Sequence, residues 1–424
     1  MKQSIGLLGL LFAFVLTPLS AQDKPLTFDQ FMIWVRQYHP VVKQADLYLE
    51  FGKQEVRKAR GGFDPYLYGS IDEKQYQEKQ YYNKREGGVL IPTVGGVEFQ
   101  GIVENNKGTY LNPEQNVPSN GLYAALQQAT IYNLASIEER RLSLINLYYD
   151  ATVAYWKWAG AYADLKVHEE GLRLAKVRFE GVIGRFEQGD LPAIDTVEAY
   201  TQVLNRSIKF QKAGYEFFSS TQELNVYLWD EEERPIGLEA LAVPEPLFSL
   251  PFQELNKDFY SEALLDHPEL RLIDYDLDYL DVERRYKAEQ LKPKIKLKYN
   301  FLTETFGGMQ QLGFLENNYK FGIQVATPLL LRKERGDLGL TKTKIADVNY
   351  KRDLKFEQLS AKLRKFFNEY QVLDQQLKIF SQNVKGLENL LKGERIKFEL
   401  GESSLFLINA RETSLFDSHL VNNS

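Results

Sequence analysis

The stretch VRQYHPVVKQADLYLEFGKQEVRKARGGFDPYLYGS, residues 35–70, decides the fold because its landmarks occur a second time in the chain. His39-Pro40 reappears as His267-Pro268, a shift of 228 positions (39 to 267). Pro65 falls on Pro293 with the same shift and no gap. Such a repeat indicates two similar halves that form one body, so a domain count from length alone would be wrong.

A second pair of matching segments follows these landmarks. Arg185-Phe186-Glu187 precedes Gly189 in the first copy, and Lys397-Phe398-Glu399 precedes Gly401 in the second, 212 positions later (189 to 401). Each copy therefore runs in the same order: a short helix, a strand signal, a long helix with heptad spacing and a glycine-marked bend.

The first 21 residues have the features of a secretory signal peptide. Lys2 supplies the positive start, residues 5–16 are apolar, and Leu19-Ser20-Ala21 fits a small-residue cleavage site. An uncleaved anchor is the alternative, but the apolar run is shorter than the ~20 residues that a spanning helix needs. No later segment is apolar enough for such a helix, so we predict an exported protein without an α-helical span.

Composition excludes several classes of protein. The 424 residues include no cysteine, which rules out disulfides, cysteine-based metal sites and the lipid anchor of a lipoprotein. The formal net charge of −6 leaves no basic surplus for a nucleic-acid role. Phe, Trp and Tyr make up 13% of the chain, an excess that is typical of the aromatic girdles of membrane barrels and also of ordinary cores.

Period-two alternation predicts strands with one apolar and one polar face. The pattern occurs in residues 63–74, 294–303 and 319–329, with a weaker fourth candidate in 122–128. We therefore predict one strand pair within 63–130, joined by a long loop at 81–120, and another within 293–330 with a shorter loop at 304–318. Strands of ~10 residues can cross a bilayer at a tilt; a soluble sheet with one wet face is the alternative.

The alternation is sharpest around residue 297, where lysine occupies every second position. Lys294, Lys296 and Lys298 share one face, opposite Leu297 and Phe301. If the strand crosses a membrane, the two apolar residues face lipid and the three lysines face water in a lumen. Rings of such lysines favour anions in pores.

Two long stretches without proline, 119–191 and 329–424, each carry a heptad seam. The first seam runs through Leu147, Ala151, Ala154, Trp158, Ala161, Leu165, His168, Leu172, Ala175 and Phe179, and the second lies 212 positions on at each step. A sustained seam requires a helical partner at every turn. A helix of ~65 residues would reach ~100 Å. A cytosolic coiled coil would also produce the seam, but not the strands fused to it.

Each seam ends at a break that should fold the helix back as a hairpin. Gly189-Asp190-Leu191 combines a helix stop with an acidic cap, and Gly401-Glu402-Ser403 does the same with a serine cap. On these residues alone, a plain helix turn is the alternative reading.

The proline-rich stretch 230–258 has no periodicity and reads as a connector between the copies. It divides the mature chain into a first repeat, 22–229, and a second, 259–424. The first holds a short helix, a strand pair and a helical hairpin at 136–229. The second has the same order, but only 23 residues follow Gly401, so we expect either a fragment or an incomplete closing helix.

No motif of an enzyme is present in the sequence. The segment His168-Glu169-Glu170 lacks the second histidine of a metalloprotease motif, and no phosphate-binding loop or serine elbow occurs. We therefore predict no catalytic residue, no cofactor and no metal site. Energy for any transport must then come from a partner.

The chain resembles the outer-membrane efflux proteins, the family of the trimeric export channel TolC, over residues 26–424. The resemblance rests on Leu26-Thr27-Phe28, Tyr38-His39-Pro40, residues 59–65, Arg185-Phe186-Glu187-Gln188-Gly189 with its repeat, and Thr327-Pro328-Leu329-Leu330-Leu331. It implies an α+β membrane protein in which three chains each give four strands to one 12-stranded outer-membrane barrel. Long helices would continue this barrel as a coiled-coil tube through the periplasm.

The resemblance also implies a function. The homotrimer would be the passive outer-membrane channel of a tripartite efflux or type I secretion system. A periplasmic adaptor (a membrane fusion protein) would dock on the helical tips and link the channel to an inner-membrane pump. The alternative is an exported coiled-coil protein that bridges envelope layers without transport.

The family's acidic gate at the tube entrance does not carry over to this chain. The matching positions, counted without gaps from Gly401, are Leu407 and Ala410. Asn409, Arg411 and Glu412 are the polar residues nearby, and their role stays open at this point.

Overall fold

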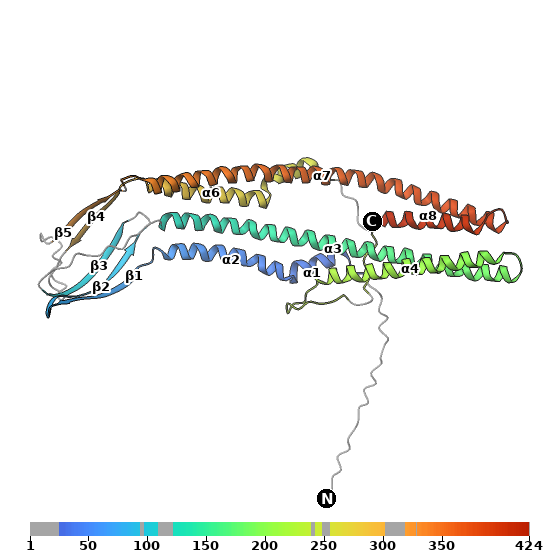
Figure 1. Ribbon diagram of the computed structural model, residues 1–424, viewed down its shortest axis with the longest axis horizontal. Coiled ribbons are helices and arrows are strands. Elements are labelled where there is room, and N and C mark those ends of the chain that lie inside the picture. The colour runs from blue at the N-terminus through green and yellow to red at the C-terminus, as the bar shows by residue number, and fades with distance from the viewer. Residues whose placement is uncertain are drawn as a thin grey trace, which may run out of the picture. The chain divides into compact units, whose positions relative to one another are not determined.

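The computed structural model describes residues 25–93, 97–108, 122–238, 242–247, 255–301, 319–327 and 329–423. The predicted signal peptide, 1–21, lies outside the described residues, as do the loop 304–318 and much of the connector. Most of the described residues are helical, with a minority in strands (Figure 1).

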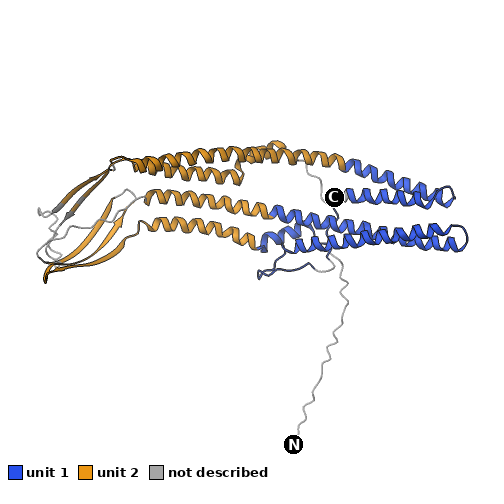
Figure 2. Ribbon diagram, viewed as in Figure 1, with its two compact units in different colours: residues 1–39, 148–252, 377–424 blue, residues 40–147, 253–376 orange. Residues whose placement is uncertain are grey.

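The chain divides into two compact units, and each unit combines segments from both predicted repeats (Figure 2). Unit 1 consists of Met1–His39, Tyr148–Phe252 and Leu377–Ser424, and unit 2 of Pro40–Leu147 and Gln253–Gln376. Two long helices, α3 (Leu122–Glu187) and α7 (Arg332–Glu399), supply residues to both units. The units of packing therefore do not coincide with the two halves of the sequence.

In unit 2, the helices α2 (Pro40–Gly61) and α6 (Pro268–Glu289) are both 22 residues long. Each begins at the proline of a His-Pro pair, where the missing N–H of proline costs no helical hydrogen bond. The imidazole of His267 caps α6, because its Nδ1 accepts the N–H of Glu269 at 3.3 Å. The two helices therefore share their kind of start and their length; the internal repeat itself stays a prediction.

Both of these helices pack against a long helix. Gly52 of α2 lies so close to α3 that an added Cβ would be 2.5 Å from Ser136 Oγ, so this contact requires glycine. Three ion pairs join α6 to the first half of α7 in antiparallel order: Lys287–Asp337 at 3.2 Å, Asp274–Arg352 at 2.5 Å and Glu269–Lys355 at 2.9 Å. The short helices α5 (Lys257–Ala263) and η1 (Leu264–Asp266) precede α6.

The strands of unit 2 form two antiparallel sheets. The first has the order β1 (Tyr66–Tyr76), β2 (Lys79–Pro92) and β3 (Glu98–Gly108), and the second pairs β4 (Lys294–Phe301) with β5 (Tyr319–Ala326). Gln77 and Glu78 connect β1 to β2 with φ values of 50° and 58°, as a two-residue hairpin turn with two positive φ angles requires.

Two of the strand predictions are wrong. Residues 122–128, the weak fourth strand candidate, are the start of α3. Leu122, Leu126 and Ala129 also fit helical spacing, and continuation of a long helix costs less than starting a separate element. With five strands among the described residues, the predicted four per chain is not the count found.

The predicted loop 81–120 holds most of β2 and all of β3. The pair Gly87-Gly88, within this predicted loop, lies inside β2. An added Cβ at Gly88 would be 2.5 Å from the carbonyl oxygen of Gly101 on β3 and 3.0 Å from Tyr68 Oη. Glycine is therefore present here for close approach within the sheet and not for a bend.

The core of unit 1 is aromatic. It contains α1 (Phe28–Tyr38), α4 (Ala193–Asn225), α8 (Leu405–Asn423) and the C-terminal parts of α3 and α7. Trp158, Tyr155 and Phe31 are fully buried, and Trp158 Nε1 donates to Thr221 Oγ1 of α4 at 3.1 Å. Of the first predicted heptad seam, Ala151, Ala154, Trp158 and Ala175 of α3 are buried.

The second seam is covered only in part. Leu391 of α7 is 6% exposed, but the seam positions Phe366 and Leu373 are 43% and 51% exposed. Within the described residues, these two side chains therefore lack the helical partner that a sustained seam requires.

Candidate functional site

The first helical tip is a hydrogen-bonded bend between α3 and α4. Gly189 adopts φ +81°, in the left-handed region that glycine reaches without a Cβ penalty. The N–H of Gly189 donates to the Phe186 carbonyl at 3.0 Å, and the N–H of Asp190 donates to the Arg185 carbonyl at 2.9 Å. This pair of bonds is a Schellman motif, which satisfies the last carbonyls of α3.

The second tip, between α7 and α8, repeats this geometry. Gly401 has φ +76°, its N–H donates to the Phe398 carbonyl at 3.1 Å, and the N–H of Glu402 donates to the Lys397 carbonyl at 2.8 Å. An added Cβ would meet no atom within 4 Å at either glycine. Backbone conformation, and not space, therefore requires glycine at both tips.

The two tips pack against each other within unit 1. Val182, Ala199 and Leu405 form a buried apolar cluster, and Leu191 and Phe398 cover it. The Arg185 guanidinium lies 5.1 Å from the centre of the Phe398 ring, a cation–π contact between the hairpins.

The predicted docking residues fall into two groups. Gly189, Asp190, Gly401 and Glu402 are exposed, whereas Leu191 belongs to the packing between the tips and Ser403 Oγ donates to Glu394 Oε1 at 2.5 Å. The prediction that Asp190 caps the following helix is wrong: α4 has Pro192 at its N-cap and no side-chain cap. Asp190 instead contributes its N–H to the end of α3.

Apolar side chains surround the exposed glycines. Ile194 on α4 is 67% exposed, Leu400 at the end of α7 is 70% exposed, and Phe406 on α8 is 67% exposed. The tips therefore present both polar backbone bends and uncovered apolar groups to whatever contacts them.

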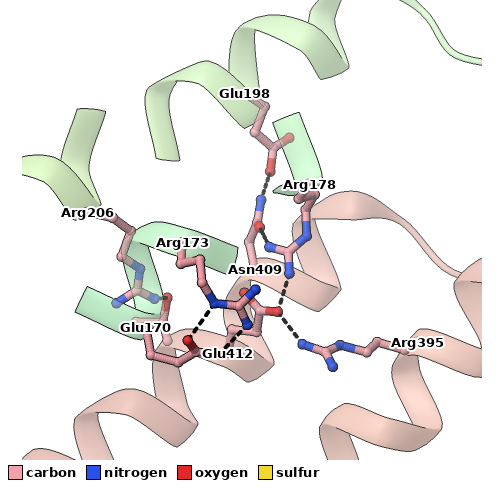
Figure 3. Close-up of polar contacts among 9 residues, drawn as sticks. Glu170, Arg173, Arg178, Glu198, Arg206, Arg395, Asn409 and Glu412 are labelled. Atoms are coloured by element: carbon pink, nitrogen blue, oxygen red, sulfur yellow. Dashed lines mark hydrogen bonds and ion pairs between the residues drawn. The ribbon is translucent and has the colours of Figure 1, made fainter. Parts of the chain in front are cut away.

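A buried ionic cluster holds α8 against its neighbours behind the tips (Figure 3). The side chain of Glu412 on α8 is 5% exposed and accepts hydrogen bonds from Arg178 of α3 and from Arg395 of α7, the latter at 2.8 Å. Asn409 lies one turn earlier: its Oδ1 accepts from Arg178 at 2.8 Å, and its Nδ2 donates to Glu198 of α4 at 3.0 Å. One helix is thus tied to three others by charge-assisted bonds.

Arg206 of α4 extends this cluster. It is 7% exposed, donates to Thr413 Oγ1 at 3.2 Å and stacks 4.6 Å above the Phe416 ring. Burial lowers the pKa of Arg206 from its usual value, and the nearby Glu412 carboxylate opposes this shift. Removal of Glu412 would therefore leave several guanidinium groups uncompensated.

In unit 2, the β4–β5 hairpin separates apolar from polar side chains. Ile295 pairs with Val325, Leu297 with Ile323 and Tyr299 with Phe321. We call these six residues the apolar hairpin face; each is at least 50% exposed. The register places Lys294 and Lys296 on the opposite face, whereas the side chain of Lys298 is outside the described part of the structure.

The β1–β3 sheet has a similar division. Leu67 pairs with Val89 on one face, and Leu67 is 81% exposed. On the other face the Lys84 side chain is 4% exposed and lies 2.7 Å from Glu86 and 3.6 Å from Glu104.

The sequence matches no family model and no curated protein. Solved structures do match over nearly the whole chain. The CmeC outer membrane channel of Campylobacter jejuni has a TM-score of 0.70 and 10% identity, over 93% of this chain and 81% of that one. The outer membrane protein VceC of Vibrio cholerae has a TM-score of 0.70 and 15% identity, over 93% of this chain and 91% of that one. A membrane protein of Pseudomonas aeruginosa has a TM-score of 0.71 and 15% identity, over 93% of this chain and 89% of that one.

The chain has a TolC-like fold. This confirms the predicted resemblance at the level of the fold. In this fold, Gly189 and Gly401 lie at bends that end α3 and α7, and Lys294 and Lys296 lie on β4; a docking role for the bends and a lumen role for the lysines stay predictions.

Sequence reasoning missed most of the ionic cluster behind the tips of the TolC-like fold. It noted Asn409, Arg411 and Glu412 but did not connect them to Arg178 or Arg206. Arg178 and Glu412 are 234 positions apart, and no local spacing links them. The sequence carried no signal for this pairing beyond the presence of polar residues near the start of the last helix.

Two negative findings apply to the described part of this TolC-like fold. No helix there is long and apolar enough to span a membrane. No group of three or more His, Asp or Glu side chains there is arranged to hold a metal ion.

Proposed function

We propose that the chain is one protomer of an outer-membrane channel, a passive conduit from the periplasm to the exterior. The observation that carries this proposal is the apolar hairpin face, whose six residues are each at least 50% exposed and which backs onto a face with Lys294 and Lys296. Exposure of apolar surface to water costs about 25 cal/mol per Å². Lipid hydrocarbon removes this cost, and water in a lumen solvates the lysines. The TolC-like fold supports the same role.

The proposed channel is a homotrimer whose strands close one barrel and whose helices extend into the periplasm. The exposed seam residues Phe366 and Leu373 support this assembly, because a neighbouring chain supplies the helical partner that this chain lacks. A closed barrel also removes the free edges of both sheets.

The exposed bends at Gly189 and Gly401 are the proposed docking sites for a periplasmic adaptor. The adaptor connects the channel to an inner-membrane transporter, which supplies the energy. Exposed Ile194, Leu400 and Phe406 support this assignment, since apolar anchors dominate the affinity of many interfaces. Association with an adaptor and a pump would be tested by their co-purification from cross-linked cells.

The ionic cluster around Glu412 restrains the periplasmic end of each protomer in this proposal. Any opening that moves α8 away from α3 and α4 must first break the bonds of Glu412 and Asn409. Loss of the cluster should therefore loosen the entrance as well as destabilise unit 1.

Planar lipid bilayers test the proposed function directly. The purified chain should give discrete conductance steps, and reversal potentials across a salt gradient should show a preference for anions. Replacement of Lys294, Lys296 and Lys298 by Gln should weaken this preference. An exported rod that only bridges envelope layers would give no conductance at all, and that result would favour the structural alternative.

A further inference from the structure

A charged cavity lies in unit 2, at the junction of three elements. It has a volume of about 230 Å³ and is lined by the end of α6, the start of β4 and the start of α7. Its charged residues are Lys287, Lys292, Lys294, Lys333, Glu334 and Asp337. With four lysines against two carboxylates, the lining carries an excess of positive charge.

Two of these lysines have their charge compensated within the chain. Lys287 lies 3.2 Å from Asp337, and Lys292 lies 2.7 Å from Glu289, which is outside the cavity. Lys294 and Lys333 are exposed and form no ion pair with any described residue. Glu334, also unpaired among the described residues of the lining, offsets one of these two charges, so the unpaired groups carry a net charge of +1 (two lysines minus one carboxylate).

The start of α7 adds to the positive potential. The first N–H groups of a helix have no intrahelical partners and favour anions. This 68-residue helix nevertheless begins with Arg332 and Lys333, with Glu334 as the acidic residue of its first turn. Cations in this position are unfavourable unless an anion lies nearby, and the cavity offers a place for one.

We propose that this cavity binds a phosphate group, with Lys294 and Lys333 as its charge partners. Lysine is a common point-charge ligand of phosphate. A cavity of about 230 Å³ far exceeds the ~10–15 Å³ that one water needs on the same measure, so it has room for a phosphate group and part of its carrier.

The position of Lys294 favours a soluble anion over a lipid headgroup as the source of the phosphate. Lys294 lies on the lysine face of β4, opposite Ile295 and the rest of the apolar hairpin face. This step rests on the proposed function: if the apolar face contacts lipid, the cavity opens on the watery side. The cavity would then be a binding site for phosphorylated anions at the junction of the strands and the helices.

Equilibrium binding to the purified full-length chain in detergent tests this site. Inorganic phosphate is titrated and followed by ³¹P NMR, which detects weak, saturable binding. The test variant is Lys294→Gln/Lys333→Gln, which leaves both ion pairs of the cavity intact. The matched control is Lys342→Gln/Lys344→Gln, the same loss of charge at exposed positions of α7 outside the cavity.

The unaltered chain and the control should bind phosphate with affinities within about twofold of each other. The cavity variant should bind at least roughly tenfold more weakly, because each lost contact with a cation contributes several-fold. Lys294→Arg/Lys333→Arg should restore binding, which would exclude a folding defect as the cause.

A second arm distinguishes the source. Phosphatidylglycerol and phosphatidylcholine are added separately in mixed micelles, and the retained lipid is counted by native mass spectrometry. Retention of phosphatidylglycerol that is lost only in the cavity variant, with a flat phosphate titration, would assign the site to a lipid headgroup. Absence of both signals, or equal losses in the cavity and control variants, would overturn the proposal.

These measurements require no conduction. A chain that binds phosphate but passes no current in bilayers would disprove the proposed channel function but not the proposed phosphate site. A chain that conducts but does not bind phosphate would disprove the phosphate site but not the channel function.

Discussion

At the scale of single residues, the two tip glycines are the clearest case of a residue whose chemistry dictates its place. Gly189 and Gly401 differ by only 5° in φ (+81° and +76°). At each bend the N–H of the glycine and the N–H of the next residue donate to the same two carbonyl positions at the end of the preceding helix. Any other L-residue would pay roughly 1–2 kcal/mol for the left-handed conformation. Space is free at both positions, so only this backbone term opposes substitution.

Gly401→Arg should destabilise the α7–α8 bend by about 1–2 kcal/mol and abolish export, while trimer formation and membrane insertion persist. Gly393→Arg is the matched control, because Gly393 lies inside α7 with open space around its Cα. The readouts are export in cells and trimer content in the outer-membrane fraction. Unchanged export from a stable Gly189→Arg/Gly401→Arg double variant would show that the bends have no docking role.

Glu412→Gln should lower the free energy of unfolding by about 3 kcal/mol, because a buried acceptor of two guanidinium groups loses its charge. Glu170→Gln is the control. Glu170 and its partner Arg173 are drawn beside the cluster in Figure 3, but their side chains are 50% and 61% exposed, so loss of this pair should change stability far less. Urea denaturation of both variants measures the difference, and equal effects would contradict it.

Acid should destabilise unit 1 partly through His39. This imidazole is 8% exposed and stacks on Tyr227 with 5.8 Å between ring centroids. Burial lowers the pKa of His39 below its usual 6.5, so the unfolded chain takes up the proton more readily. Its contribution to stability is therefore complete above pH 6.5 and is lost as the pH falls below that value.

The measurement is the free energy of unfolding between pH 7.5 and 5.5, for the unaltered chain and for His39→Gln. The variant should show a shallower decrease. Some decrease should persist, because burial also lowers the pKa of His168 and of His267. Identical slopes for the two proteins would exclude His39 as a contributor.

At the scale of elements, the β4–β5 hairpin shows how strand phase determines which side chains meet which solvent. Successive side chains point to opposite faces, so a shift of one residue would exchange Leu297 with Lys296. The observed pairs Leu297–Ile323 and Lys296–Gln324 keep apolar residues together and polar residues together. The long helices follow the same logic with a period of 3.5 residues.

Leu297→Arg should block assembly in the membrane, since an arginine on a lipid-facing strand costs about 2–4 kcal/mol near the midplane. Lys296→Glu, at the adjacent position on the opposite face, should assemble normally. Protease-resistant protein in the outer-membrane fraction measures assembly. Equal behaviour of the two variants would mean that the assigned phase is wrong.

At the scale of the whole molecule, the uneven burial of the two seams is the main structural argument for an oligomer. The seam of α3 is buried at Ala151, Ala154 and Trp158, whereas that of α7 is open at Phe366 and Leu373. Copies of one pattern should be covered alike if the chain were complete by itself. The proposed trimer removes the discrepancy.

Leu373→Arg should therefore prevent assembly and reduce the mass in light scattering from that of three chains to that of one. Gln375→Arg adds the same side chain two positions later, on a different face of α7, and should leave the mass unchanged. A trimeric Leu373→Arg protein would show that this part of the seam is not an interface between chains.

The sequence by itself determined the features that depend on local spacing. Period-two alternation located β1, β4 and β5, heptad spacing located α3 and α7, and the glycines marked both bends. The resemblance to the TolC family, now matched by the fold, rested on the same short segments. The sequence-based prediction was wrong where one local pattern fits two structures. Residues 122–128 alternate but belong to a helix, and the predicted loop 81–120 contains Gly87-Gly88, which packs inside a sheet.

Only the tertiary structure decided which distant residues meet. Arg178 and Glu412 are 234 positions apart, and the cavity joins the end of α6, β4 and the start of α7. The two packing units also cut across the repeat, because each draws on both halves of the chain. The physical reason is that periodicity records which face of an element is apolar, whereas the choice of partner depends on the packing of whole elements, to which each residue contributes a small part.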